Sequence, residues 1–451
     1  LTKHKSLKPW HKAILNNENF YVYEQGGKDL EEHYNYMQSL PDLKETFQQL
    51  KDAEISLPTF QVNHLAKFKN YKTYLKNFKG QTMQTVHKLS KLTALILLAS
   101  TSVSANANSE TDAKATIDLN LRYEAVDQDN AKKDASALTL RTRLNYTTAS
   151  YKDFTTVIEF EDSRQVAGVN SYNDTVGNNT EYSVIADPET TELDQAYVQY
   201  KKDGITAKVG RQVITLDNHR YVGHVGWRQD RQTFDAATIT YAALEKVKMS
   251  YSYINKRNRI FSDEKDFDTK DHLLNIAYKT SYGKLTAYSY LLEIDEGTAN
   301  SLDTFGVSFN GKKDNFSYSA EFATQDSESG GTDYSASYMA IQGGYSFDTL
   351  TLKLGAEVLG SDEAMYGFST PLATLHKFNG WADMFLGTPK EGLVDLYVSV
   401  SGKAFGGGWT VTVHDYSADE STDTVDDLGS EINAVYTKKF ANNYSAGIKY
   451  A

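Results

Sequence analysis

The chain alternates between apolar and polar residues from Ala115 onward. Along residues 115–126 single polar residues separate the apolar ones, and the same period returns along 136–147. Successive side chains of a β-strand point to opposite faces, so each such segment predicts a strand with one apolar and one polar face. Seventeen strands are predicted, at residues 115–126, 136–147, 153–163, 193–201, 204–211, 232–242, 246–257, 270–280, 284–295, 301–311, 315–325, 334–346, 349–360, 392–402, 408–416, 430–438 and 443–451.

The connections between these strands alternate in length. Short turns such as 201–204 and 312–315 are followed by long connections such as 212–231 and 361–391. Short turns on one rim and long loops on the other are typical of a bacterial outer-membrane β-barrel. The first and seventeenth strands run in the same direction, whereas such barrels have an even strand number. We therefore expect an all-β transmembrane antiparallel barrel with 18 strands in the parent, about 17 of them present and the last one missing. If the count is wrong by one, the barrel has 16 strands and is complete.

A targeting signal precedes the strands. Residues 83–107 begin with Met83, continue through the basic Lys88 and Lys91 into the apolar stretch 92–99, and end on small residues. That order predicts a secretory signal peptide. Because a signal normally starts a protein, we expect residues 1–82 to be an upstream, non-barrel extension that is not part of the genuine protein. A regulatory extension is the alternative. Residues 108–451 are then the barrel.

Composition narrows the class further. The chain has no cysteine, which excludes disulfides and thiolate chemistry. Outside the signal, no run of 18 apolar residues predicts a membrane-spanning helix. The 31 tyrosines suit a membrane interface, although tyrosine also favours strands. Residues 108–451 hold 33 basic and 50 acidic residues, and this excess of acidic residues does not indicate a nucleic-acid-binding surface. The expected partners are outer-membrane lipid and lipopolysaccharide, the barrel-assembly machinery and small hydrophilic solutes.

Two blocks are more specific than the alternation. The first runs through residues 209–212, Arg220, 227–229 and 231–236, and the second covers 368–386 and continues to 396. Both resemble the alginate-export family of outer-membrane porins, and a weaker resemblance extends over about 110–451. The resemblance implies an 18-stranded barrel with a charged lumen. Many members of that family have no established substrate, so the resemblance says little about alginate itself.

If the apolar residues face lipid, the polar ones line a water-filled pore. An Arg or Lys side chain on the lipid face near the midplane costs roughly 2–4 kcal/mol, and this cost fixes the register of each strand. The candidate pore-lining and selectivity residues are Arg141, Arg143, Glu159, Glu161, Arg211, Arg220, His224, Arg228, Arg231 and Asp235.

Two long connections carry candidate chemistry. The loop from Arg211 to Arg231 is rich in cations, and we expect it to fold into the barrel and narrow it. Arginine holds carboxylates and phosphates in a two-pronged way, so the loop predicts selectivity; the alternative is that its arginines pair with acids and only stiffen the barrel. The block 371–386 predicts a compact loop that packs on itself or plugs the channel. Its candidates for sugar contact are His376, Lys377, Trp381 and Asp383, and the alternative is that they form the small core of the loop.

Taken together, the patterns favour a passive outer-membrane porin for small hydrophilic solutes, anionic or sugar-like. No H-E-x-x-H or G-x-S-x-G motif indicates an enzyme, and no cofactor or metal is predicted. The alternatives are a non-channel outer-membrane barrel, such as an adhesin or a hydrolase, and a secreted soluble β protein.

Overall fold

The computed structural model describes residues 112–294, 300–440 and 443–451. The chain divides into two units, Leu1–Thr101 and Ser102–Ala451, and all described residues belong to the second. The predictions for residues 1–82 and for the signal peptide at 83–107 lie outside the described residues and stay predictions. No helix among the described residues is long and apolar enough to span a membrane.

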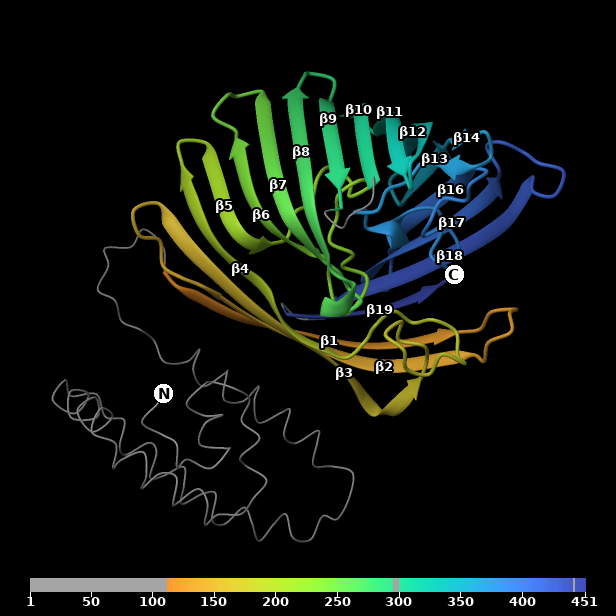
Figure 1. The fold of residues 1–451 in the computed structure, drawn as a ribbon, viewed down its shortest axis with the longest axis horizontal. Helices are drawn as coiled ribbons and strands as arrows, with labels where there is room; N and C mark the ends of the chain where they lie inside the picture. Colours follow the sequence, from red (N-terminus) through yellow and green to blue (C-terminus); the bar gives the residue numbers. More distant parts are fainter. Residues whose placement is uncertain (1–111, 295–299, 441–442) are drawn as a thin grey trace, which may run out of the picture. The chain divides into compact units, whose positions relative to one another are not determined.

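Seventeen strands form one antiparallel sheet (Figure 1). They are β1 Lys114–Val126, β2 Ala135–Thr147, β3 Phe154–Ser171, β4 Thr190–Lys202, β5 Ile205–Gln212, β6 Thr233–Tyr241, β7 Val247–Asn258, β8 Phe267–Lys279, β9 Lys284–Glu293, β10 Asn300–Lys313, β11 Phe316–Ser329, β12 Thr332–Ser346, β13 Leu350–Leu359, β16 Leu393–Ala404, β17 Gly407–Ser417, β18 Asp427–Phe440 and β19 Tyr444–Tyr450. The prediction of seventeen strands is confirmed, and an eighteenth in the parent stays a prediction.

Smaller elements lie in two of the long connections. A two-residue hairpin, β14 Ser361–Asp362 and β15 Tyr366–Gly367, and the 3-10 turn η3 Leu375–Lys377 lie between β13 and β16. The turn η2 Asp263–Lys265 lies between β7 and β8. Within the described block 371–386, which the sequence predicts as a compact loop, η3 is therefore the only helical turn. The third strand was predicted to end near residue 163, yet it pairs with β2 as far as Ser171, where it lies opposite Ser136.

Each strand pairs with the next one along the chain, and β13 pairs with β16 across the small hairpin. In the registers of the described strands, β1 pairs only with β2, and β19 pairs only with β18. Both edge strands nevertheless contact one indole. The Arg122 Cζ atom of β1 lies 3.8 Å from the centroid of the Trp227 ring, and the Lys449 Nζ atom of β19 lies 4.0 Å from it. The sheet therefore curls until its first and last strands come close together.

The two faces of the sheet differ in chemistry as the alternation predicts. On β1, Ile117, Leu119 and Leu121 are 61–65% exposed, because they project outward from the sheet. Directly paired residues share a face, so Leu140, opposite Leu121, projects outward as well. Thr139 and Arg141, which alternate with Leu140, are buried on the inner face. The apolar face is thus the lipid face and the polar face lines the interior.

Two long connections fold onto the inner face of the sheet. We call residues 213–232 the first inward loop and residues 360–392 the second inward loop. They meet at a parallel bridge between Val222 and Leu372, where the Gly223 amide donates to the Leu372 carbonyl at 2.8 Å. Val222 and Leu372 are buried in an apolar cluster with wall residues such as Tyr338. The expectation that both loops turn inward therefore agrees with the structure.

The face assignment predicts opposite outcomes for neighbouring residues of β16. Val398 projects outward and Ser399 inward. A Val398→Arg substitution places a charge in hydrocarbon, and it is expected to lower the free energy of unfolding in lipid vesicles by about 2–4 kcal/mol. Ser399→Arg, the matched control, is expected to cost much less because water reaches its side chain. Equal losses for the two variants in denaturant titrations contradict the assignment.

Candidate functional site

Three arginines of the first inward loop are held by carboxylates on the barrel wall or the second inward loop. The Arg228 guanidinium lies 3.2 Å from Glu124 on β1 and 3.1 Å from Asp383 on the second inward loop. Its side chain is only 8% exposed. A buried arginine without partners is strongly destabilising, so these pairs fix where the loop lies. Arg228 therefore ties the first inward loop to β1 and to the second inward loop at once.

Arg220 and Arg231 complete this set. Arg220 is fully buried, with its Nε atom 2.8 Å from Glu357 of β13, and its Nη2 atom donates to Asn379 at 3.1 Å. Arg231 lies 2.7 Å from Asp194 of β4 and also pairs with Glu159 of β3. These contacts correspond to the alternative given above for the loop from Arg211 to Arg231, in which its arginines pair with acids and stiffen the barrel.

The four candidates on β2 and β3 lie on the inner face beneath this loop. Arg143 pairs with Glu161 on β3, and its Nη2 atom donates to the Gln229 carbonyl at 3.3 Å. Arg141 pairs with Asp118 of β1. Gln229 itself is fully buried and donates through Nε2 to Thr139 Oγ1 at 2.8 Å. The candidates on β2 and β3 are therefore brought together with the end of the first inward loop.

Arg211 and Asp235 do not join them. They lie opposite each other in the β5–β6 register and pair at 2.8 Å. Val209, two residues before Arg211 and thus on the same face, is 65% exposed and projects outward. The predicted pore-lining position of these two residues is therefore wrong. Near the rim of a barrel a charge on the outer face costs little, about 0–1 kcal/mol, so the pair is tolerated there.

Two buried titratable groups of the first inward loop are shifted by their surroundings. Asp230 is 1% exposed, and within the described residues neither of its carboxylate oxygens accepts a hydrogen bond. Burial, then the Glu192 and Glu161 carboxylates, raises the pKa of Asp230 well above its usual range. Burial, and then His219 at 5.3 Å between ring centroids, lowers the pKa of His224. Both groups are therefore favoured in their neutral forms.

An aromatic and cationic cluster joins the two inward loops to both edge strands. Its members are Trp227 of the first inward loop, His376 and Trp381 of the second, Arg122 of β1 and Lys449 of β19. The Trp227 and His376 rings stack with centroids 3.9 Å apart and planes 9° apart. The Lys449 Nζ atom lies 4.0 Å from the Trp227 centroid and 4.1 Å from the Trp381 centroid. Such cation–π contacts are each worth about 0.5–2 kcal/mol. We call this set the indole cluster.

Hydrogen bonds fix the protonation of His376 in this cluster. Its Nε2 atom lies 2.8 Å from the Lys449 ammonium, which can only donate, so Nε2 accepts and carries no proton. Its Nδ1–H then donates to Asp383 at 2.5 Å. Burial lowers the pKa of His376 to about 4, although Asp383 acts in the opposite direction. The imidazole is therefore neutral at pH 7.

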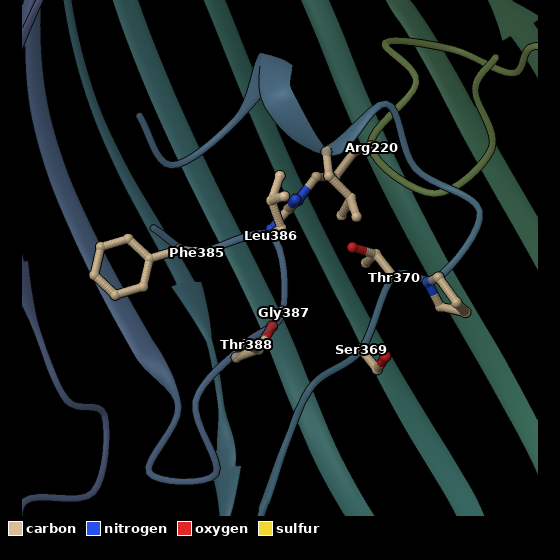
Figure 2. Close-up of a pocket in the computed structure, with 9 residues that line it drawn as sticks. Arg220, Ser369, Thr370, Phe385, Leu386, Gly387 and Thr388 are labelled. Atoms are coloured by element: carbon tan, nitrogen blue, oxygen red, sulfur yellow. The ribbon is translucent and has the colours of Figure 1, made fainter. Parts of the chain in front are cut away.

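The remaining candidates of the second inward loop have structural contacts. Lys377 donates from Nζ to the Asn218 carbonyl at 2.7 Å. The Trp381 amide donates to Glu431 of β18 at 2.5 Å. Figure 2 shows a hollow where this loop meets Arg220, with Ser369, Thr370 and Thr388 around it. Its volume of about 40 Å³ leaves room for no more than a few water molecules. The hollow is a packing gap where the two inward loops meet and is too small to be a solute site.

Several residues that build this site were not singled out from the sequence. Arg122, Glu124 and Lys449 lie on the polar side of the first and last strands, and only the curl of the sheet brings them together. Trp227 lies within the block 227–229 but had been assigned no role. Among the described residues no group of three or more His, Asp or Glu side chains is arranged to hold a metal ion.

His376 predicts a pH dependence of the contact between the loops. Its pKa lies below the ordinary value of 6.5, so the stability it contributes is present above about pH 6.5 and is lost as the pH falls toward 4. The opening free energy of the second inward loop is expected to fall by about 1.4 kcal/mol per pH unit in that window. Hydrogen exchange of residues 372–386 measures it, and His376→Gln is expected to remove this part of the slope. An unchanged slope in that variant contradicts the assignment.

Solved structures share this fold. OccAB1 of Acinetobacter baumannii aligns with a TM-score of 0.58 at 14% identity, over 77% of this chain and 92% of that chain. OccK9 (OpdG) of Pseudomonas aeruginosa gives a TM-score of 0.58 at 11% identity, over 75% and 92%. The outer membrane protein OpdK of Pseudomonas aeruginosa, solved with vanillate, gives 0.56 at 10% identity, over 75% and 92%. No curated protein sequence matches this chain.

The family comparison covers more than half of the sequence. The model of the alginate export family matches residues 112–358, which include the candidates on β2 and β3 and the whole first inward loop. The match agrees with the lipid-facing sheet and the outer-membrane proteins of the same fold. The chain belongs to the alginate export family of β-barrel porins, in the bacterial outer membrane.

Proposed function

We propose that this porin lets small hydrophilic solutes, anionic or sugar-like, diffuse passively through a lumen narrowed by the two inward loops. The observation that carries the proposal is the indole cluster, since it places Arg122, Lys449 and two indole rings on the inner side of the sheet. Flat indole faces stack on sugar rings, and guanidinium and ammonium groups attract carboxylates.

The cations of the lumen favour anions only as far as their carboxylate partners leave positive charge uncompensated. Arg228 is buried, with a side chain only 8% exposed, and it pairs with Glu124 and Asp383. It therefore acts on a passing carboxylate through its charge rather than through direct contact. Rings of charged side chains set selectivity in pores. The acids paired with these arginines reduce the preference, so we expect weak anion selectivity.

Diffusion needs no covalent chemistry, so neither an enzyme activity nor a cofactor is part of the proposal. Lipopolysaccharide at the outer face and the barrel-assembly machinery are proposed partners, because a lipid-facing sheet in the outer membrane needs a lipid surround and a route of insertion. Planar-bilayer recordings of the purified protein test the proposal most simply. Discrete steps of conductance are expected, and their absence favours a non-channel adhesin or hydrolase.

Arg228 predicts the sign and origin of selectivity. In a salt gradient the reversal potential is expected to show anion preference, and Arg228→Glu is expected to lower the anion-to-cation permeability ratio by at least about twofold. Arg164→Glu is the matched control, because Arg164 lies opposite the outward Leu140. A cation-selective wild type, or an identical ratio in the Arg228 variant, removes anion preference from the proposal.

A further inference from the structure

A hollow of about 660 Å³ opens on the outward face of β4 to β7. Leu193 and Val209 lie on one side of it and Tyr253 on the other, and the small residues Gly210 and Ala237 lie between them. Val209, Ala237 and Tyr253 share one face because they are paired across β5, β6 and β7. Because this face is turned to the bilayer, the hollow is an apolar groove toward lipid.

The backbone builds this groove, so it does not depend on flexible side chains. Gly210 has a φ of 122°, and a Cβ atom there would lie 2.2 Å from the Ala196 carbonyl oxygen, so no other residue fits without a shift. The β6–β7 register slips by one residue between Asp235 and Ala236, which leaves Asn255 unpaired in that ladder. Such a bulge bends the strand locally. The backbone conformation of β5 to β7 therefore fixes the shape of the groove.

One end of the groove carries a cation with spare donors. Arg211 donates to Asp235 at 2.8 and 3.2 Å and to the Leu193 carbonyl at 3.2 Å. These bonds use three of its five N–H groups, and the side chain is 21% exposed. β5 starts at the two-residue turn after Lys202, so Arg211 lies at the opposite end, on the rim with the long connections. That rim faces the outer leaflet in a bacterial barrel.

We propose that this groove binds one acyl chain of a phosphorylated glycolipid of the outer leaflet, with a phosphate oxygen accepting from Arg211. An apolar groove in a lipid-facing surface is filled by a chain rather than by water, since its lining offers water few partners. The free N–H groups at its outer end suit a phosphate, which arginine binds in a two-pronged way. The inference rests on the outer-membrane location and is independent of what passes through the lumen.

Native mass spectrometry of the protein extracted in mild detergent tests the site, with diphosphorylated lipid A and its dephosphorylated form as probes. Wild type is expected to retain one lipid A. Ala237→Leu fills the groove and is expected to weaken retention by about tenfold, which corresponds to about 1.4 kcal/mol. Ala356→Leu is the control on the same face, because Ala356 lies opposite Ile341, which is 62% exposed. Arg211→Gln leaves the groove open and is expected to abolish the preference for the phosphorylated probe.

Three results would each overturn the proposal. The first is that Ala237→Leu and Ala356→Leu retain lipid equally, and the second is that Arg211→Gln keeps the full preference for the phosphorylated probe. Alternatively, the groove variant changes the number of protein copies in the particle instead of the bound lipid, which assigns the groove to a second copy of the chain. Heat-dependent gel mobility identifies variants that have not folded. If Ala237→Leu does not fold, the lipid preference of Arg211→Gln alone decides whether the proposal holds.

Discussion

The structure depends on one physical constraint: hydrocarbon does not solvate charges or unpaired peptide groups, so exposing them to lipid costs free energy. A strand in lipid must give every backbone donor and acceptor to a neighbouring strand, and must turn its apolar side chains outward. Among the described strands of the sheet, each one between β1 and β19 pairs antiparallel with a neighbour on both sides, the two edge strands pair with one neighbour each, and the strands carry exposed apolar residues on the outside. The inner face then has to hold everything that lipid excludes. Its charges are consequently numerous and paired.

That pairing explains how long connections become part of the lumen. Arg228, Arg231 and Arg220 of the first inward loop each reach a carboxylate on a different part of the wall, at Glu124, Asp194 and Glu357. The second inward loop adds Asp383 and His376 and brings Trp381 against Lys449. A loop held at so many points is fixed in position on the inner face of the sheet.

The sequence was informative about strands because their period is short and local. A period of two over ten residues places each strand within a few residues, and the outward set on β1 could be predicted from Ile117 and Leu119 alone. The end of β3 could not, because its pairing with β2 up to Ser171 continues where the alternation has stopped. The predicted inward turn of two loops came from their cations and apolar residues, which need partners away from lipid.

The candidate site was predicted only in part, for a physical reason. Arg141, Arg143, Glu159 and Glu161 follow from strand period. The prediction counts Arg211 with the loop and Asp235 with the pore lining, although strand parity puts both on the face of Val209. Arg122 and Lys449 meet at Trp227 across more than a hundred residues of chain on either side. No local pattern reports such contacts, because the curl of the whole sheet creates them.

Site-directed spin labelling along β2 is the most direct measurement, and the absence of cysteine allows each label to stand alone. Labels at Leu138→Cys and Leu140→Cys are expected to be accessible to oxygen, which concentrates in lipid. Labels at Asn145→Cys and Thr147→Cys, on the inward parity of the same strand and not buried, are expected to be accessible to a water-soluble nickel reagent. An accessibility profile with this period of two supports a lipid-facing barrel. A profile in which both reagents fail at Leu138 and Leu140 shows a packed protein interior there and contradicts it.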